Sequence, residues 1–301
     1  MPDERPNFFA GPYIERRAEE REDPEWLAAA RADGATRYLV SRGTAQLLSA
    51  GPEPHIVFLA NDAPLLAAAA PESFVLLGWY RGARCVLADL PVERAPLTAL
   101  PADTQLAELR PLSAVLPAEE AGLLAYARAL VIWRARHRHC GACGAPTVPT
   151  QAGHCLRCSR AGCGQEFYPR IDPAIIVLVS DGERALLGRQ ASWPARRYST
   201  IAGFVEPGES IEDAVAREVG EETGVALTGL NYHSSQPWPF PSSVMIAFQA
   251  RAAAGAPVRV GRELEDARWF SRAQVESGEV LAPPSQSISW RLIEHWLKGR
   301  G

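Results

Sequence analysis

Residues 203–225 read GFVEPGESIEDAVAREVGEETGV. Ser210 and Asp213 have the spacing of a capping box, which marks the start of a helix. Gly224 is a typical helix stop, because glycine adopts the left-handed backbone conformation at little cost. We therefore predict a helix over residues 210–223.

The acidic side chains of this helix indicate its chemistry. At about 100° per residue, Glu218 and Glu222 fall within the apolar stripe and Glu221 lies at its edge. Clustered carboxylates repel one another and are costly to bury unless a cation joins them, and Mg²⁺ or Mn²⁺ prefers such oxygens. Arg217 is placed to orient a carboxylate, such as that of Glu209. A solvated acidic face is the alternative, and the apolar stripe argues against it.

Composition narrows the class of protein. The chain has 301 residues, enough for two domains and a small module. A net charge of −4 disfavours a protein that grips nucleic acid mainly through its backbone. No apolar run approaches the roughly 18 residues of a membrane span, and the charged N-terminal stretch lacks a signal core. We expect a cytoplasmic protein without membrane contact.

Apolar runs and helical patterns divide the chain into three predicted domains, at residues 1–135, 136–168 and 169–301. The first is a small α/β domain that indicates no chemistry, the second holds a cysteine cluster, and the third has another α/β pattern. Predicted strands are 55–59, 74–80, 175–179, 184–189 and 244–250, and further predicted helices are 118–136 and 285–297.

Five of the six cysteines lie close together in the sequence, which indicates a metal site and not a disulfide framework. Cys140 and Cys143 form one pair of thiolates. The second pair is either Cys155 with Cys158 or Cys158 with Cys163. We prefer the latter, because the glycine after Cys163 repeats the pattern at Cys143. Four thiolates suit tetrahedral Zn²⁺ and leave no open position, so this zinc would be structural.

Other cysteines and histidines near this cluster have simpler interpretations. Cys155 would be a spare thiol. His137, His139 and His154 are expected at the surface and not as ligands. Cys85 stands alone and is expected to be a buried structural thiol.

The segment 203–225 resembles the Nudix box, the signature of the Nudix hydrolases. It matches at Gly203, Glu209, Arg217, Glu218, Val219, Glu221, Glu222, Gly224 and Val225. The resemblance implies an α/β/α sandwich, accompanied here by the zinc ribbon and the small N-terminal domain. In this family the loop and helix bind metals that clamp a pyrophosphate and activate water.

Site roles follow from the same resemblance. It implies Mg²⁺ or Mn²⁺ ligands at Glu218, Glu221 and Glu222. Glu222 is also the candidate that helps to deprotonate water. Glu263 resembles the additional metal ligand of a later loop, and Glu265 is the reserve candidate.

Residues 235–245 read SQPWPFPSSVM. Three prolines stiffen this loop, so its aromatic rings are held in fixed positions that suit a flat base. Packing is the alternative role for Trp238 and Phe240. The string resembles the SQPWPFPxS signature of the NADH pyrophosphatase group of Nudix hydrolases, which has the same domain order. Recognisable motifs cover residues 137–301.

This second resemblance implies the substrate contacts and the assembly. Tyr168 and Phe204 would contact the nicotinamide or base, and a homodimer would build each active site from both chains. Further candidates for substrate contact are Gln236, Trp238, Phe240 and Ser289. The implied reaction converts NADH or NAD⁺ to AMP and nicotinamide mononucleotide, and it also removes NAD caps from RNA.

Alternatives remain for the substrate and for RNA binding. A basic run comprises Arg134, His137 and Arg138 with Arg136 and His139, and it is either an RNA phosphate contact or a solvated surface. The substrate could instead be ADP-ribose or a nucleotide sugar. A non-catalytic zinc-ribbon protein with a Nudix fold is a third reading, which the intact glutamate cluster argues against.

Overall fold

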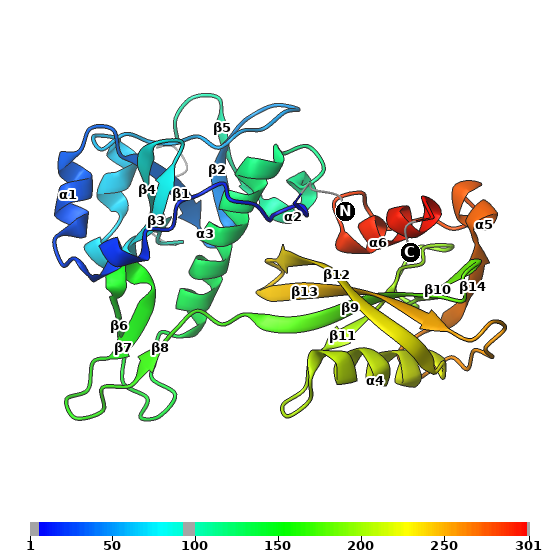
Figure 1. Cartoon of the computed structure of the whole chain (residues 1–301). Helices are drawn as coiled ribbons and strands as arrows, with labels where there is room; N and C mark the ends of the chain where they lie inside the picture. The colour runs from blue at the N-terminus through cyan, green and yellow to red at the C-terminus, as the bar shows by residue number, and fades with distance from the viewer. Residues whose placement is uncertain (1–5, 93–99, 300–301) are drawn as a thin grey trace. The chain divides into compact units, whose positions relative to one another are not determined.

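The computed structural model describes residues 6–92 and 100–299. The described chain forms two compact units (Figure 1). The N-terminal unit contains Phe9–Arg170 and Pro239–Ser242. The C-terminal unit contains the chain up to Phe8, then Ile171–Trp238 and the chain from Ser243 onward. The cysteine cluster therefore belongs to the N-terminal unit.

A five-stranded sheet in the order β3-β4-β1-β2-β5 forms the core of the N-terminal unit. Its strands are β1 (Arg37–Arg42), β2 (Ala45–Ser49), β3 (Phe74–Tyr80), β4 (Ala83–Leu90) and β5 (Thr104–Glu108). The helices are α1 (Trp26–Ala32), α2 (Leu109–Leu112) and α3 (Ala118–Arg136), with 3-10 turns η1 (Ala18–Glu22), η2 (Pro64–Ala68) and η3 (Pro71–Ser73). The predicted strand 74–80 and helix 118–136 are confirmed.

The predicted strand 55–59 is wrong as a continuous element. Ile56 makes a single bridge with Leu48, and Leu59 makes a single bridge with Tyr38. The segment thus pairs with β2 at one residue and with β1 at another, so no ladder extends along it. Cys85, in contrast, is fully buried on β4 as expected, and burial raises the pKa of its thiol to about 12.

Three antiparallel strands hold the cysteine cluster: β6 (Thr147–Thr150), β7 (Cys155–Cys158) and β8 (Glu166–Phe167). The turn η5 (Gln151–Gly153) joins the first two and packs against β3, where a side chain at Gly153 would approach Val75 to 2.9 Å. The surface position expected for His154 is therefore wrong. Its ring is buried, and Nε2 lies 2.7 Å from the carbonyl oxygen of Leu76.

A six-stranded sheet organises the C-terminal unit, with the path β12-β13-β9-β10-β14 and with β11 paired to β9. Its strands are β9 (Asp172–Ser180), β10 (Arg184–Arg189), β11 (Ile201–Phe204), β12 (Leu227–Trp238), β13 (Ser243–Ala252) and β14 (Asp266–Ser271). Its helices are α4 (Ile211–Thr223), α5 (Arg272–Glu276) and α6 (Ile288–Leu297). The predicted strands 175–179, 184–189 and 244–250 and the two predicted helices correspond to these elements.

Alternate side chains of β9 pack on opposite faces of this sheet, as the period of two in a strand requires. Val177 packs with Val219 of α4 on one face. Leu178 packs with Leu292 of α6 on the other face. The helices therefore cover the two faces of the sheet (Figure 1), which is the predicted α/β/α sandwich.

Helix α4 begins and ends as the sequence predicts. Ser210 and Asp213 form a reciprocal capping box, and Gly224 ends the helix with φ 67°. No helix within the described residues is long and apolar enough to cross a membrane.

Candidate active site

The apolar stripe of α4 carries two glutamates into the sandwich. Glu218 is 8% exposed and Glu222 is 6% exposed, although both are carboxylates. They lie beside Val215 and Val219, which anchor the helix to the sheet. Glu221, at the edge of the stripe, is exposed. The helix thus carries two buried carboxylates and an exposed one close together in the sequence.

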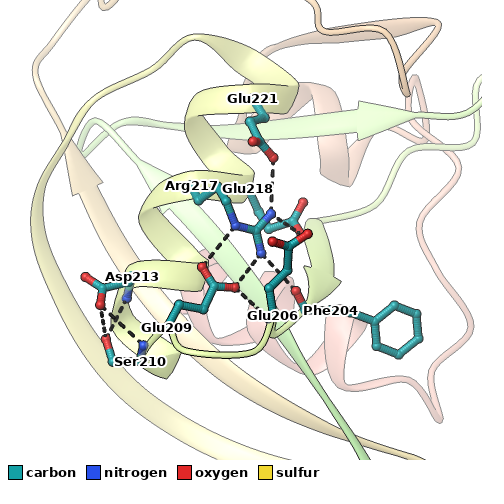
Figure 2. A network of polar contacts seen from close by, with 8 residues as sticks. All are labelled: Phe204, Glu206, Glu209, Ser210, Asp213, Arg217, Glu218 and Glu221. Atoms are coloured by element: carbon teal, nitrogen blue, oxygen red, sulfur yellow. Dashed lines mark hydrogen bonds and ion pairs between the residues drawn. The ribbon is translucent and has the colours of Figure 1, made fainter.

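Arg217 is the centre of the polar network that Figure 2 shows. Its guanidinium donates to Glu209 at 2.6 and 3.0 Å, to Glu218 at 3.0 Å and to Glu221 at 3.1 Å. It also donates to the carbonyl oxygen of Phe204 at 2.9 Å. One cation therefore fixes the loop before α4, the end of β11 and two candidate metal ligands relative to one another.

The backbone of β11 lies directly against the Glu218 carboxyl group. A Cβ atom placed on Gly203 would overlap that carboxyl group. Glycine is required here because of close approach, which leaves room for a carboxylate between strand and helix. The first glycine of the motif thus has a structural reason within this chain.

A second segment is docked on the C-terminal turn of α4. The amide of Gly261 donates to the carbonyl of Glu222 at 2.8 Å, and the amide of Arg259 donates to that of Thr223 at 2.8 Å. These bonds satisfy carbonyls that have no partner within the helix. Glu263 follows two residues later, and its charge acts on the buried glutamates of α4.

The two acidic residues of this segment differ in their surroundings. Glu265 forms an ion pair with Arg189 of β10, and its backbone amide donates to the Arg189 carbonyl at 2.9 Å. Leu264 lies between these two glutamates in the sequence, and its side chain points inward against Gly188. Glu263 is therefore the better candidate for the additional metal ligand, and Glu265 is held by its arginine.

The electrostatics of these carboxylates fit a bound cation. Burial, followed by the charges of Glu218 and Glu263, raises the pKa of Glu222 to about 7. Burial also raises the pKa of Glu218, against the opposing effect of Arg217. Hydrogen bonds from Arg217 lower the pKa of Glu209 to about 2. A hard divalent cation would offset the cost of burying negative charge at Glu218 and Glu222.

The cysteine cluster converges on one point. The Sγ atoms of Cys140, Cys143, Cys158 and Cys163 all lie within 4.8 Å of one another. Among the described residues, this is the one compact group of metal-ligating atoms. Cys155 lies outside it and is fully buried. Four thiolates at this separation suit tetrahedral zinc, and the preferred pairing of Cys158 with Cys163 is the one that the structure brings together.

Two aromatic candidates for substrate contact are presented to solvent within their own units. Phe204 is 59% exposed, and its ring points away from the Arg217 network (Figure 2). Tyr168 is 55% exposed, and its hydroxyl donates to Glu166 at 2.9 Å. Glu166 in turn accepts from Arg157 at 2.6 and 2.9 Å, so an ion pair on the ribbon holds the Tyr168 ring.

Gln236 and Ser289 are not presented to a ligand, contrary to expectation. Gln236 is fully buried, and its amide nitrogen donates to the carbonyls of Phe8 and Gln286 while its oxygen accepts from the amide of Ile288. Ser289 is 3% exposed, and its hydroxyl is bonded within the fold to Ser199 and Thr200. These side chains hold β12 and α6 in place, because their polar atoms are already satisfied by the protein.

The proline-aromatic loop is half-buried. Phe240 makes an edge-to-face contact with Phe9 at 5.9 Å between ring centroids, and the guanidinium groups of Arg110 and Arg128 lie over its ring at 4.3 and 5.1 Å. Packing therefore explains much of Phe240. Trp238 is also half-buried.

The basic run is less open than its sequence indicates. Arg134 donates to the carbonyl of Glu72, and burial lowers the pKa of its guanidinium. Arg136, Arg138 and His139 are exposed. An RNA contact there would involve these three residues.

Sequence reasoning missed the docked segment around Gly261. The segment that precedes Glu263 is held on α4 through backbone hydrogen bonds, which side-chain patterns do not reveal. The one signal was a glycine two residues before the acidic candidate, where a Cβ atom would overlap the carbonyl of Glu221.

The sandwich, the capped α4 and its glutamate site define a Nudix domain. Family models match along the chain: a NADH pyrophosphatase-like rudimentary NUDIX domain at residues 22–133, a NADH pyrophosphatase zinc ribbon domain at 135–168 and a NUDIX domain at 170–295.

Curated relatives cover nearly the same span. The NAD-capped RNA hydrolase NUDT12 of Homo sapiens is 32% identical over 97% of this chain and 73% of its own length. The NAD-capped RNA hydrolase NudC of Deinococcus radiodurans is 40% identical over 79% and 86%, and that of Mycobacterium bovis is 37% identical over 90% and 87%. A solved NUDIX hydrolase from Nitrosomonas europaea covers 54% of this chain and 92% of its own, at 18% identity and a TM-score of 0.45. This chain belongs to the Nudix hydrolase family, in the branch with NADH pyrophosphatase-like and zinc ribbon domains.

Proposed function

We propose that this chain hydrolyses the pyrophosphate of NAD(H) to AMP and nicotinamide mononucleotide, and that it removes NAD caps from RNA 5′ ends. The observation that carries the proposal is the pair of buried glutamates on α4, on which the charge of Glu263 acts, in a chain whose relatives are named NAD-capped RNA hydrolases. Such a carboxylate set suits a pyrophosphate with its metals and has no evident use in a binding module.

The glutamates would hold the catalytic cation, Mg²⁺ or Mn²⁺. Glu218, Glu221 and Glu222 of α4 and Glu263 of the docked segment are the proposed ligands. When bound, the cation neutralises the pyrophosphate and stabilises charge on the departing phosphate. Zn²⁺ at the cysteine cluster would be structural.

Side chains around the cation have separable roles. Arg217 orients Glu218 and Glu221 through the hydrogen bonds described above. Glu222 is buried among the proposed ligands and is the candidate that accepts a proton from the attacking water. Glu209 stays ionised and keeps Arg217 in place. In this proposal the chain itself supplies one proton acceptor, Glu222, and one guanidinium group, that of Arg217, which holds the carboxylates in place.

Base recognition is proposed for the exposed rings. Phe204 leaves the sheet beside the glutamates, so its ring is available to stack on a nicotinamide or adenine. Tyr168 would supply the second aromatic surface. A homodimer and a cytoplasmic location complete the proposal, by resemblance to the NADH pyrophosphatase group.

Replacement of Glu222 tests the mechanism. Glu222→Gln keeps the size of the side chain and removes its capacity to accept a proton, so we expect kcat for NADH to fall by about 100-fold or more. Glu212→Gln is the matched control, because Glu212 lies on the same helix and is exposed. Hydrolysis at the wild-type rate by Glu222→Gln, with normal folding, would remove Glu222 from the mechanism.

A further inference from the structure

Arg189 is the last residue of β10, and its side chain is only 13% exposed although it is charged. Its guanidinium forms an ion pair with Glu265. The same group donates to the carbonyl oxygens of Trp193 at 3.0 Å and Pro194 at 3.4 Å. One side chain therefore joins the segment that contains Glu263 to the loop that follows β10.

The segment that contains Glu263 is held at both of its ends. At the first end, the amide of Gly261 donates to the carbonyl of Glu222 on α4 at 2.8 Å. At the second end, the amide of Glu265 donates to the carbonyl of Arg189 at 2.9 Å, and β14 begins at the next residue. Glu263 lies midway between these two ends in the sequence. Its backbone position is therefore set by α4 on one side and by β10 on the other.

The ion pair with Arg189 distinguishes the two acidic side chains of this segment. Glu263 and Glu265 are both exposed. The Arg189 guanidinium engages Glu265, whereas the charge of Glu263 acts on Glu218 and Glu222. Like charges repel, so Glu263 stays near the α4 pair only if its segment is held there or a cation joins the carboxylates. The contacts of Arg189 oppose that repulsion, because they fix the chain on the C-terminal side of Glu263.

We propose that Arg189 is a positioning residue for the catalytic cation. Its guanidinium holds Glu265 and the backbone around it, and this keeps Glu263 within reach of a cation bound by Glu222 and its neighbours on α4. The proposal rests on the proposed function, because it takes Glu263 and the glutamates of α4 as the ligands of Mg²⁺ or Mn²⁺. Arg189 is not itself a ligand, since a guanidinium stays protonated and offers no acceptor atom.

The sign of the effect distinguishes positioning from simple charge. A positive charge near a cation site repels the cation, so Arg189→Gln would by charge alone strengthen the binding of Mn²⁺. Loss of positioning has the opposite effect, because removal of a group that supports a metal ligand typically weakens binding by about tenfold or more. We therefore expect Arg189→Gln to raise the Kd for Mn²⁺ about tenfold.

Titration of Mn²⁺ into the full chain measures this Kd without any hydrolysis. Zinc is retained, no substrate is added, and free Mn²⁺ is followed by its electron paramagnetic resonance signal. Glu263→Gln removes the proposed ligand and should weaken binding at least as much as Arg189→Gln does. Arg184→Gln is the matched control, because Arg184 lies on the same strand and pairs with Asp181 instead. The control should bind Mn²⁺ as the wild type does.

A double variant tests whether Arg189 acts through Glu263. If it does, Arg189→Gln should no longer raise the Kd when it is added to Glu263→Gln, because the positioned ligand is already absent. Glu265→Gln removes the same ion pair from its exposed side, so it is the second variant if Arg189→Gln does not fold. It should also weaken Mn²⁺ binding, and most of its effect should disappear in the Glu263→Gln background.

Two kinds of failure are distinguishable. If Glu263→Gln weakens Mn²⁺ binding and Arg189→Gln leaves it unchanged or strengthens it, the positioning role is overturned and the metal site stands. A further loss of binding in the double variant also overturns the positioning role, since Arg189 would then act on the fold in general. Mn²⁺ binding that is indifferent to Glu263→Gln overturns the ligand set of the proposed function, and the role of Arg189 with it.

Discussion

Several ionisable side chains of this protein are buried, and burial shifts their pKa values away from the ordinary range. Glu222 and Glu218 are buried acids, and burial raises the pKa of Glu222 to about 7, so a cation bound there as we propose would compete with a proton. Acidification should therefore weaken binding of the divalent cation at this site. His154 is a buried base, and burial lowers its pKa to about 4.

His154 makes stability depend on pH. Its folded-state pKa of about 4 lies below the ordinary value near 6.5, so the unfolded chain takes up the proton first as the pH falls. Stability from this residue is complete above about pH 6.5 and is lost as the pH falls toward 4, with about 2 kcal/mol lost by pH 5. Thermal melts of the wild type and His154→Gln between pH 8 and pH 5 measure the difference.

His139→Gln is the control for that experiment, because His139 is exposed on the same ribbon. The control should keep the pH slope of the wild type, and His154→Gln should have a shallower one. Equal slopes for all three proteins would show that His154 titrates normally in the folded state.

At the scale of elements, the segment that precedes Glu263 docks on the C-terminal end of α4, and we propose that it positions Glu263. Gly261 places its amide on the Glu222 carbonyl, and a Cβ atom at this position would overlap the Glu221 carbonyl. Gly261→Ala should shift the segment and move Glu263 away from the cation. We expect the concentration of Mn²⁺ needed for half-maximal activity to rise about tenfold, which is typical of a disturbed ligand support.

Gly220→Ala is the matched substitution, because a Cβ atom at Gly220 of α4 meets nothing within 4 Å. It should leave the Mn²⁺ dependence unchanged. An excess of Mn²⁺ should restore the activity of Gly261→Ala, which a general loss of folding would not allow. An unchanged Mn²⁺ dependence in Gly261→Ala would disprove the positioning role.

The ribbon offers a second test at this scale. Cys163→Ser removes one of the four converging thiolates and should release most of the bound zinc and lower the unfolding temperature. Cys155→Ser should retain zinc, because Cys155 lies outside the cluster. Zinc per chain, measured on both purified variants, decides the assignment. Retention by Cys163→Ser together with loss in Cys155→Ser would reverse it.

Elements with a local signal were predictable from the sequence, and those fixed by distant partners were not. The capping box of Ser210 and the apolar, β-branched run of β9 lie within one segment each, so the local pattern alone located them. His154 is buried by β3, far away in the sequence, and residues 55–59 divide their pairing between two strands. The burial of Gln236 was also not predictable from local sequence, because one of its hydrogen-bond partners is the carbonyl of Phe8, far away in the chain.

On the scale of the whole molecule, three separate stretches of the chain build the C-terminal unit, and the first of them ends at Phe8. Asn7 donates to the Ser234 hydroxyl at 3.0 Å and to the Ser235 carbonyl at 2.7 Å, and it accepts from Arg291 at 2.9 Å. Asn7 therefore supports α6 and also β12, the strand that leads into the proline-aromatic loop. The fold of the Nudix domain thus includes residues that precede the N-terminal sheet.

Identification of the reaction products decides whether this chain hydrolyses NAD(H). The purified chain is offered NADH, NAD⁺, ADP-ribose and NAD-capped RNA in parallel with Mg²⁺ or Mn²⁺, at low and high salt, and the products are identified by mass. We expect nicotinamide mononucleotide from NAD(H) and from capped RNA, with salt inhibiting only the RNA reaction if the exposed arginines bind phosphate. Cleavage of ADP-ribose without release of nicotinamide mononucleotide from any substrate would rule out the proposed hydrolysis of NAD(H).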